Sequence, residues 1–143
     1  MTTSNPPCTA RHLDHTAIAV SNLEEAIHLY ADLFGITPGP IEEIPDQAVR
    51  AAMLKVGATR IELIQPTDPQ GAIARFIERR GEAIHHLCLQ VDNLQTGLDA
   101  LAAGGVDLID KSPRQGLAGM IAFLHPRSTG GVLIELVDRA TVQ

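Results

Sequence analysis

The sequence contains no tryptophan, and aromatic residues of all kinds make up only 3% of its 143 residues. Proteins that bind single-stranded nucleic acid rely on aromatic side chains on which the bases stack. Positive charge is scarce as well, because 17 acidic residues against 11 lysines and arginines leave a net charge of -6. A nucleic-acid-binding surface needs basic groups that contact phosphates. Both shortages argue against nucleic acid as a partner.

Cysteines and long apolar runs are also scarce. Cys8 and Cys88 form no Cys-x-x-Cys motif, and we expect both to be reduced thiols. No apolar run approaches the roughly 20 residues that cross a bilayer. The first residues lack the basic and apolar segments of a secretory signal. We therefore expect a cytoplasmic protein with no membrane partner, in which residues 1–11 form a flexible N-terminal tail.

What the sequence does contain is an internal repeat. The frame His-x-x-x-x-Val-x-Asn-Leu begins at His15 and begins again at His86. Each half then ends on a matched Ile-Glu-Leu triplet, which places Glu62 in the first half and Glu135 in the second. Such self-similarity indicates duplication of one supersecondary unit. Each half therefore contributes one histidine and one glutamate at equivalent positions.

The apolar spacing predicts the same element order, β-α-β-β-β, in both halves. The first module covers residues 12–66, the second covers 84–139, and a helix at 70–80 links them within one α+β domain, 12–143. The first module's helix follows a capping box from Ser21 to Glu24 and ends at Gly35. Asp92 is the expected cap of the second module's helix. The expected strands are 13–20, a short or irregular segment at 41–45, 49–56, 60–65, 84–91, 106–109, 121–124 and 132–137.

Two histidines and two glutamates suit a divalent metal such as Co, Mn, Ni, Zn or Fe. His15 and His86 head equivalent strands, and Glu62 and Glu135 lie in equivalent apolar strands. A lone carboxylate in such a strand would be costly to bury unless it were paired or coordinated. Singly, each residue would more often be structural or solvent-facing. The two matched pairs favour a metal site, and His85 is expected to point away from it.

Three residues of the second module's loops are candidates for substrate contacts. Arg114 and Arg127 are loop cations whose guanidinium groups suit phosphates. His125 begins the last loop, where a ligand contact is plausible. Each of them alone is more often a solvated surface residue.

With these residues in place, the chain resembles the vicinal oxygen chelate superfamily and, within it, the methylmalonyl-CoA epimerase family. The resemblance covers residues 13–138, and its most specific passages are RGE-x-x-HH and HPRSTGGVLIELVD. It implies two β-α-β-β-β modules that form a cupped, barrel-like mixed sheet around a metal, in a homodimer. It implies metal ligation by the four residues already selected: His15, Glu62, His86 and Glu135.

The implied reaction interconverts the (R) and (S) epimers of an acyl-CoA, methylmalonyl-CoA, by proton transfer at C2 through a metal-stabilised enolate. Inversion calls for two acid/base groups, and the resemblance assigns Glu135 as one of them. Some relatives carry a second glutamate where this chain has Ala51. Alanine cannot move a proton, so Glu43, Asp46, Glu62 or a metal-bound water remain alternatives.

Two other functions compete with this interpretation. The first is a glyoxalase I-type lactoylglutathione lyase or another metal-dependent enzyme of the chelate fold. The lyase shares the histidine and glutamate set and also proceeds through an enediolate. The HPRSTGGVLIELVD ending favours the epimerase. A non-catalytic binding module of the same fold commonly lacks the four metal ligands, so their presence counts against it.

Overall fold

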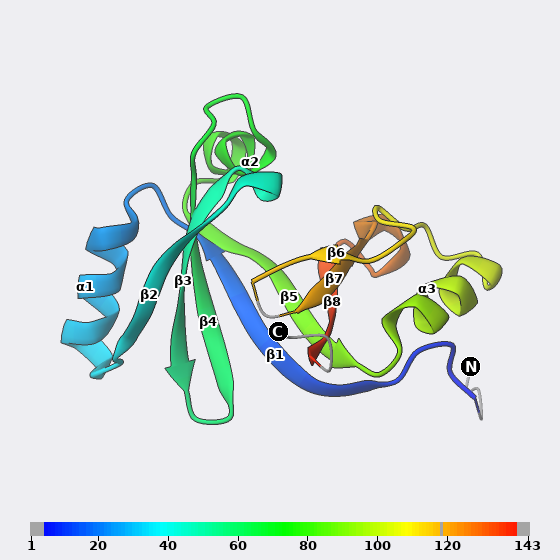
Figure 1. Cartoon of the computed structure of the whole chain (residues 1–143). Helices are drawn as coiled ribbons and strands as arrows, with labels where there is room; N and C mark the ends of the chain where they lie inside the picture. The colour runs from blue at the N-terminus through cyan, green and yellow to red at the C-terminus, as the bar shows by residue number, and fades with distance from the viewer. Residues whose placement is uncertain (1–4, 118, 140–143) are drawn as a thin grey trace. The chain divides into compact units, whose positions relative to one another are not determined.

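The computed structural model describes residues 5–117 and 119–139 (Figure 1). The chain divides into two compact units. His15–His86 forms the first unit, and Met1–Asp14 together with Leu87–Gln143 forms the second unit. The strands β1 (Ala10–Ala19) and β5 (Ala83–Val91) each contribute residues to both.

The first unit contains the predicted β-α-β-β-β order followed by the linking helix. Its strands are arranged in the order β2-β3-β4-β1, in which β1 and β4 are parallel and the other pairings are antiparallel. A single turn of 3-10 helix, Pro45–Gln47, separates the second and third strands. The remaining elements are α1 (Leu23–Phe34), β2 (Pro38–Ile44), β3 (Val49–Val56), β4 (Thr59–Pro66) and α2 (Ala72–Arg80).

One face of these strands is covered by α1, which lies beside β2, β3 and β4 in Figure 1. Leu23 and Ile27 of the helix pack with Leu54 and Leu63 of the strands in one buried cluster. On the same side, Arg50 of β3 donates to Glu24 at 2.6 Å, and this guanidinium lowers the pKa of the Glu24 carboxyl. Because side chains alternate along a strand, the residues between these positions face the other way.

The helix α1 begins one residue later than predicted. Its cap is Asn22, whose Oδ1 accepts a hydrogen bond from the Glu25 backbone N–H at 3.0 Å, so the Ser21 capping box was wrong. The extended backbone of Asn22 lets its short side chain reach that amide. The predicted end at Gly35 is confirmed, since this residue adopts a left-handed φ of 66°.

The second unit repeats the parallel pairing of the first. Its strands have the order β5-β8-β7-β6, with β5 and β8 parallel and the others antiparallel. Its core places Leu94 and Leu98 of the helix against Leu124 and Leu136 of the strands. The elements are α3 (Leu94–Ala103), β6 (Arg114–Gln115), β7 (Met120–Leu124), a 3-10 turn (Pro126–Ser128) and β8 (Ile134–Asp138).

Two predicted features of the second unit were wrong. The strand at 106–109 is reduced to one isolated bridge, between Leu108 and Leu124. The N–H groups of Ile109 and Asp110 both donate to the Phe123 carbonyl, and such convergence on one residue interrupts a ladder. The outer strand is instead β6, in the segment predicted to be a loop.

The cap of α3 also differs from the prediction. Asp92 pairs with Arg11 at 3.1 Å and does not cap the helix. Asn93 occupies the cap position with a left-handed φ of 50° and makes no side-chain capping bond. The Leu94 N–H donates to Asp138 Oδ2 at 3.4 Å instead. A carboxylate from β8 thus accepts a hydrogen bond from the first turn of α3, which lies far from it in sequence.

The described part of the predicted tail is partly structured. β1 begins at Ala10, three residues before the predicted strand, and Cys8 packs on the α3 side of the core beside Gly97. Burial raises the pKa of the Cys8 thiol. Cys8 and Cys88 are both free thiols, as predicted. Among the described residues, no helix combines the length and apolar character that crossing a membrane requires.

Candidate metal centre

The two modules repeat one register around their histidines and glutamates. In the first unit, the parallel pairing of β1 and β4 sets Ala17 opposite Glu62, and His15 precedes Ala17 by two positions. In the second, the pairing of β5 and β8 sets Cys88 opposite Glu135, and His86 precedes Cys88 by two positions. The sequence repeat therefore corresponds to a structural repeat in the positions that were predicted to bind metal.

Three of the four predicted ligands lie together in the first unit. His15 Nε2 lies 3.4 Å from Glu62 Oε1, and His86 Nε2 lies 3.8 Å from the same oxygen. The centroids of the two imidazole rings are 5.8 Å apart, and the rings meet edge to face. Only 3% of His15, 6% of Glu62 and 3% of His86 is exposed. The strands thus direct two Nε2 atoms and one carboxylate oxygen toward a common point.

The chemistry of this donor set fits a divalent metal. Two imidazole nitrogens and a carboxylate oxygen are ligands that Zn, Fe, Co, Ni and Mn accept. Burying a carboxylate costs free energy unless it has a positively charged partner. The strand residues directly opposite Glu62 are both apolar, Ala17 on β1 and Met53 on β3. A cation at the meeting point of the three side chains would supply the missing positive charge.

The fourth predicted ligand, Glu135, belongs to the second unit. It is the second residue of β8, opposite Cys88 of β5 and Phe123 of β7, with 5% of its surface exposed. Its flanking residues, Ile134 and Leu136, pack into the apolar cluster of that unit. Alternation along the strand therefore directs Glu135 away from that cluster.

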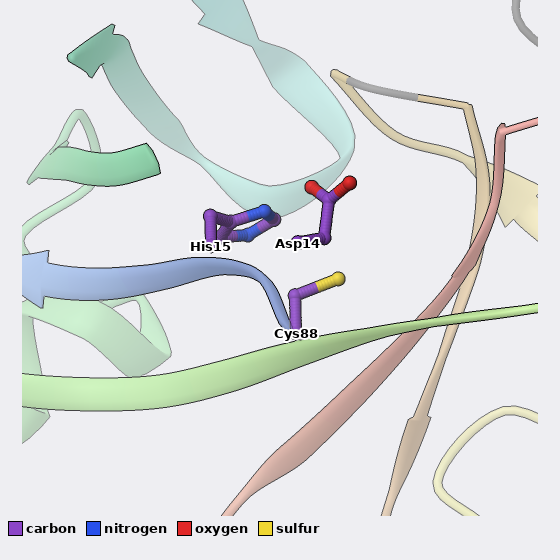
Figure 2. A group of neighbouring side chains, drawn as sticks. All are labelled: Asp14, His15 and Cys88. Atoms are coloured by element: carbon purple, nitrogen blue, oxygen red, sulfur yellow. The ribbon is translucent and has the colours of Figure 1, made fainter. Parts of the chain in front are cut away.

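Asp14 is a buried carboxylate that sequence reasoning did not select. It accepts a hydrogen bond from Arg139 at 3.0 Å, and its side chain is 2% exposed. Figure 2 shows it on β1, with the Cys88 thiol on β5 near it, and a carboxylate oxygen of Asp14 lies within 4.8 Å of Cys88 Sγ. Its one signal in the sequence was its place in the repeat, where it is equivalent to His85.

That His85 points away from the metal site stays a prediction, but its ring is in contact with that of His86. The Nδ1 atoms of the two neighbouring rings are only 2.8 Å apart. His85 is half-buried and its ring meets Phe76 of α2 edge to face, with 4.8 Å between the ring centroids. The strand alternation governs where Cα–Cβ bonds point, but long side chains can still bring their ends together.

The three predicted substrate-binding residues have partners within the second unit. Arg114 Nε lies 3.1 Å from Asp110 Oδ1, and its guanidinium carbon lies over the Phe123 ring, 5.5 Å from the ring centroid. Arg127 Nε lies 2.8 Å from Asp107 Oδ2, with 69% of the arginine side chain exposed. His125 Nδ1 accepts from the Arg127 backbone N–H at 3.1 Å and caps the 3-10 turn.

Comparison with known proteins gives the class of this fold and site. A model of the Glyoxalase/Bleomycin resistance protein/Dioxygenase superfamily matches residues 14–123. The chain therefore belongs to this superfamily, which is the class that the duplicated module and its histidine and glutamate pairs define.

Individual relatives narrow the class. The ethylmalonyl-CoA/methylmalonyl-CoA epimerase of Cereibacter sphaeroides is 34% identical over 127 residues, which cover 87% of this chain and 95% of that protein. A crystal structure of methylmalonyl-CoA epimerase from Mycobacterium tuberculosis is 38% identical, with a TM-score of 0.86 over 96% of this chain and 92% of that one. A Streptomyces coelicolor methylmalonyl-CoA epimerase in complex with 2-nitronate-propionyl-CoA is 30% identical, with a TM-score of 0.89 over 94% and 99%.

Within the superfamily, the chain is a member of the methylmalonyl-CoA epimerase family of isomerases. The predicted resemblance and the predicted vicinal oxygen chelate fold are both confirmed by these relatives. The glyoxalase alternative loses support at the same step, because the relatives reported above carry the epimerase name.

Proposed function

We propose that this chain interconverts the (R) and (S) epimers of methylmalonyl-CoA with a divalent metal held by His15, Glu62, His86 and Glu135. The observation that carries the proposal is the convergence of His15 and His86 on Glu62 in a chain of the epimerase family. The repeated register of the second unit supports the inclusion of Glu135. A bound divalent ion would supply Lewis-acid stabilisation of negative charge on the thioester and carboxylate oxygens.

The chain's own residues must move a proton at C2 of the substrate. That hydrogen is acidic because C2 lies between a thioester and a carboxylate. Glu135 is the proposed base on one side of C2. Because Glu135 is almost fully buried, bulk water has little access to its carboxylate and competes little with the substrate for it. A positioned acid/base of this kind contributes about 10²–10⁴-fold to the rate.

Inversion at C2 needs a second group on the opposite side, and the strand register restricts where it can be. Ala51 is fully buried on β3 and lies opposite Ile64, so it shares the face of Glu62. Glu43 lies opposite Arg50, on the α1 face, and this disfavours it. Asp46 lies in the 3-10 turn, outside the strand pairing that sets the face of Ala51.

The register supports a different carboxylate, Glu42, as the second acid/base. Glu42 of β2 lies directly opposite Ala51, and side chains at directly opposed positions of antiparallel strands share a face. Their Cβ atoms are about 4.5–5.5 Å apart in such pairs. A glutamate at 42 can therefore reach the space that a glutamate at 51 would occupy.

The neighbouring glutamates provide a matched test of this assignment. Glu42→Gln is expected to slow epimerisation by about 10²-fold or more, since one of two proton transfers loses its group. Glu43→Gln, which alters the α1 face, is expected to stay within twofold of wild type. Steady-state rates for both epimers, measured with saturating metal, distinguish the two. Equal rates for the two variants would assign the second transfer elsewhere, with Glu62 next in order.

The CoA portion of the substrate requires contacts with its phosphates. The proposed contacts are Arg127, whose side chain is mostly exposed, and Arg114, with His125 at the start of the same loop as Arg127. Bidentate guanidinium contacts suit phosphate oxygens. The proposal also includes a homodimer, which follows from the family resemblance. It includes a cytoplasmic location, which follows from the expected lack of a secretory signal and of a membrane-spanning apolar run.

Deuterium exchange tests the proposed reaction directly. The protein, loaded in turn with Co, Mn, Ni, Zn and Fe, is incubated with methylmalonyl-CoA in D₂O. We expect deuterium at C2, detected by mass spectrometry, and loss of this exchange after chelation of the metal. Absence of exchange with every metal would overturn the proposal. Conversion of a glutathione hemithioacetal to lactoylglutathione under the same conditions would favour the glyoxalase-type lyase.

A further inference from the structure

The two adjacent histidines of β5 are in direct contact through equivalent atoms. His85 Nδ1 and His86 Nδ1 are 2.8 Å apart, a hydrogen-bond distance, and the ring centroids are 5.1 Å apart at an interplanar angle of 80°. The opposite edge of the His86 ring carries Nε2, which faces Glu62 at 3.8 Å. One nitrogen of His86 is therefore engaged by His85, while the other faces the carboxylate.

This contact determines which tautomer of His86 can act as a ligand. A neutral imidazole has one N–H donor and one nitrogen with a lone pair. If Nε2 of His86 offers its lone pair to a metal, then Nδ1 must carry the hydrogen. Nδ1–H can then donate to His85 Nδ1, which accepts, and the hydrogen of His85 must lie on its Nε2. His85 thus holds the place that a carboxylate or a backbone carbonyl holds behind most metal-binding histidines.

The His85 ring is itself held in place by α2. Phe76 meets it edge to face at 4.8 Å and 83°, and the Arg80 guanidinium lies 5.9 Å from the centre of the Phe76 ring. This leaves His85 half-buried between the linking helix and His86. A ring supported on one side by an aromatic contact presents its Nδ1 in a fixed direction.

We propose that His85 is a positioning residue that accepts a hydrogen bond from His86 and thereby holds His86 in the tautomer and orientation that bind the metal. The inference rests on the proposed function, because it takes His86 to be a ligand. It assigns a role to a side chain that the reaction itself does not use. Outer partners of this kind typically affect metal affinity by about 10–100-fold.

Two substitutions separate hydrogen bonding from packing. His85→Phe keeps an aromatic ring against Phe76 but removes the acceptor. His85→Asn removes the ring but keeps an acceptor. The Asn carbonyl oxygen is two bonds from Cβ, as Nδ1 is in histidine. Co²⁺ affinity is measured for wild type and both variants by competition with a chromogenic chelator. The visible absorption of the bound Co²⁺ reports its coordination, and thermal unfolding without metal reports the fold.

We expect His85→Phe to bind Co²⁺ about 10–100-fold more weakly than wild type, with an altered visible spectrum. His85→Asn is expected to stay within about threefold of wild type and to keep its spectrum. Wild-type affinity in His85→Phe, or an equal loss in both variants, would overturn the positioning role and leave the proposed function standing. Failure of the wild-type protein to bind Co²⁺ and, in the same competition assay, Mn, Ni, Zn and Fe would overturn both.

Discussion

Glu135→Gln is expected to lower the rate of C2 deuterium exchange by about 10²–10⁴-fold, the contribution of one positioned acid/base. Glutamine has nearly the same size as glutamate, and its carbonyl oxygen can still face a metal, but it cannot accept the C2 proton. The variant is compared with wild type in D₂O at saturating metal, so that occupancy does not limit the rate.

Metal affinity separates the two proposed roles of Glu135. We expect the Co²⁺ affinity of Glu135→Gln to fall less than its exchange rate, because loss of the base blocks proton transfer even when the metal site is full, whereas loss of a ligand acts chiefly by emptying the site. If the exchange rate recovers to near the wild-type value once enough metal is added, Glu135 is a ligand only. Glu25→Gln, an exposed substitution on α1, should match wild type in both measurements.

The parts of the site that lie in repeated, regular strands could be predicted from the sequence. Side chains alternate along a strand, so His15 and Ala17 share a face, and a parallel neighbour then sets Glu62 opposite Ala17. Because the module is duplicated, Glu135 lies opposite Cys88 in the second unit in the same way. Periodicity and repetition are local signals, and they were enough to select these positions without knowledge of the fold.

The remaining features depend on register and side-chain conformation, which periodicity does not contain. A shift of one residue exchanges the two faces of a strand, and the pairing of β2 with β3 contains an irregularity between Pro38 and Ile41. The register beyond it decides that Glu42, and not Glu43, shares the face of Ala51. No local pattern in the sequence places that irregularity.

Two contacts that depend on the folded structure could not be predicted from the sequence either. Asp14 and Arg139 pair although they lie near opposite ends of the chain. The contact between His85 and His86 depends on the conformations of both rings and on the support of α2. Strand alternation places the two side chains on opposite faces and does not reveal that their ring atoms meet. The Asp14–Arg139 pair is tertiary, whereas the His85–His86 contact joins sequence neighbours and only its support by Phe76 is tertiary.

His15→Ala is expected to abolish the stabilisation of the protein by metal. A ligand present at 100 times its Kd stabilises the native state by about 2.7 kcal/mol. Wild type should therefore resist urea more strongly with Co²⁺ than with a chelator, and His15→Ala should unfold at the same urea concentration in both. Glu62→Gln, which keeps an oxygen ligand in place, should retain part of the difference.

His28→Ala is the matched control, because this histidine lies exposed on α1 and its removal should leave the effect of Co²⁺ unchanged. Stabilisation of His15→Ala equal to that of wild type would mean that the ion binds elsewhere. The convergence of His15 and His86 on Glu62 would then need another cause, such as a proton held between the imidazoles and the carboxylate. A difference confined to His15→Ala and Glu62→Gln would tie the stabilising ion to the centre formed by the first unit.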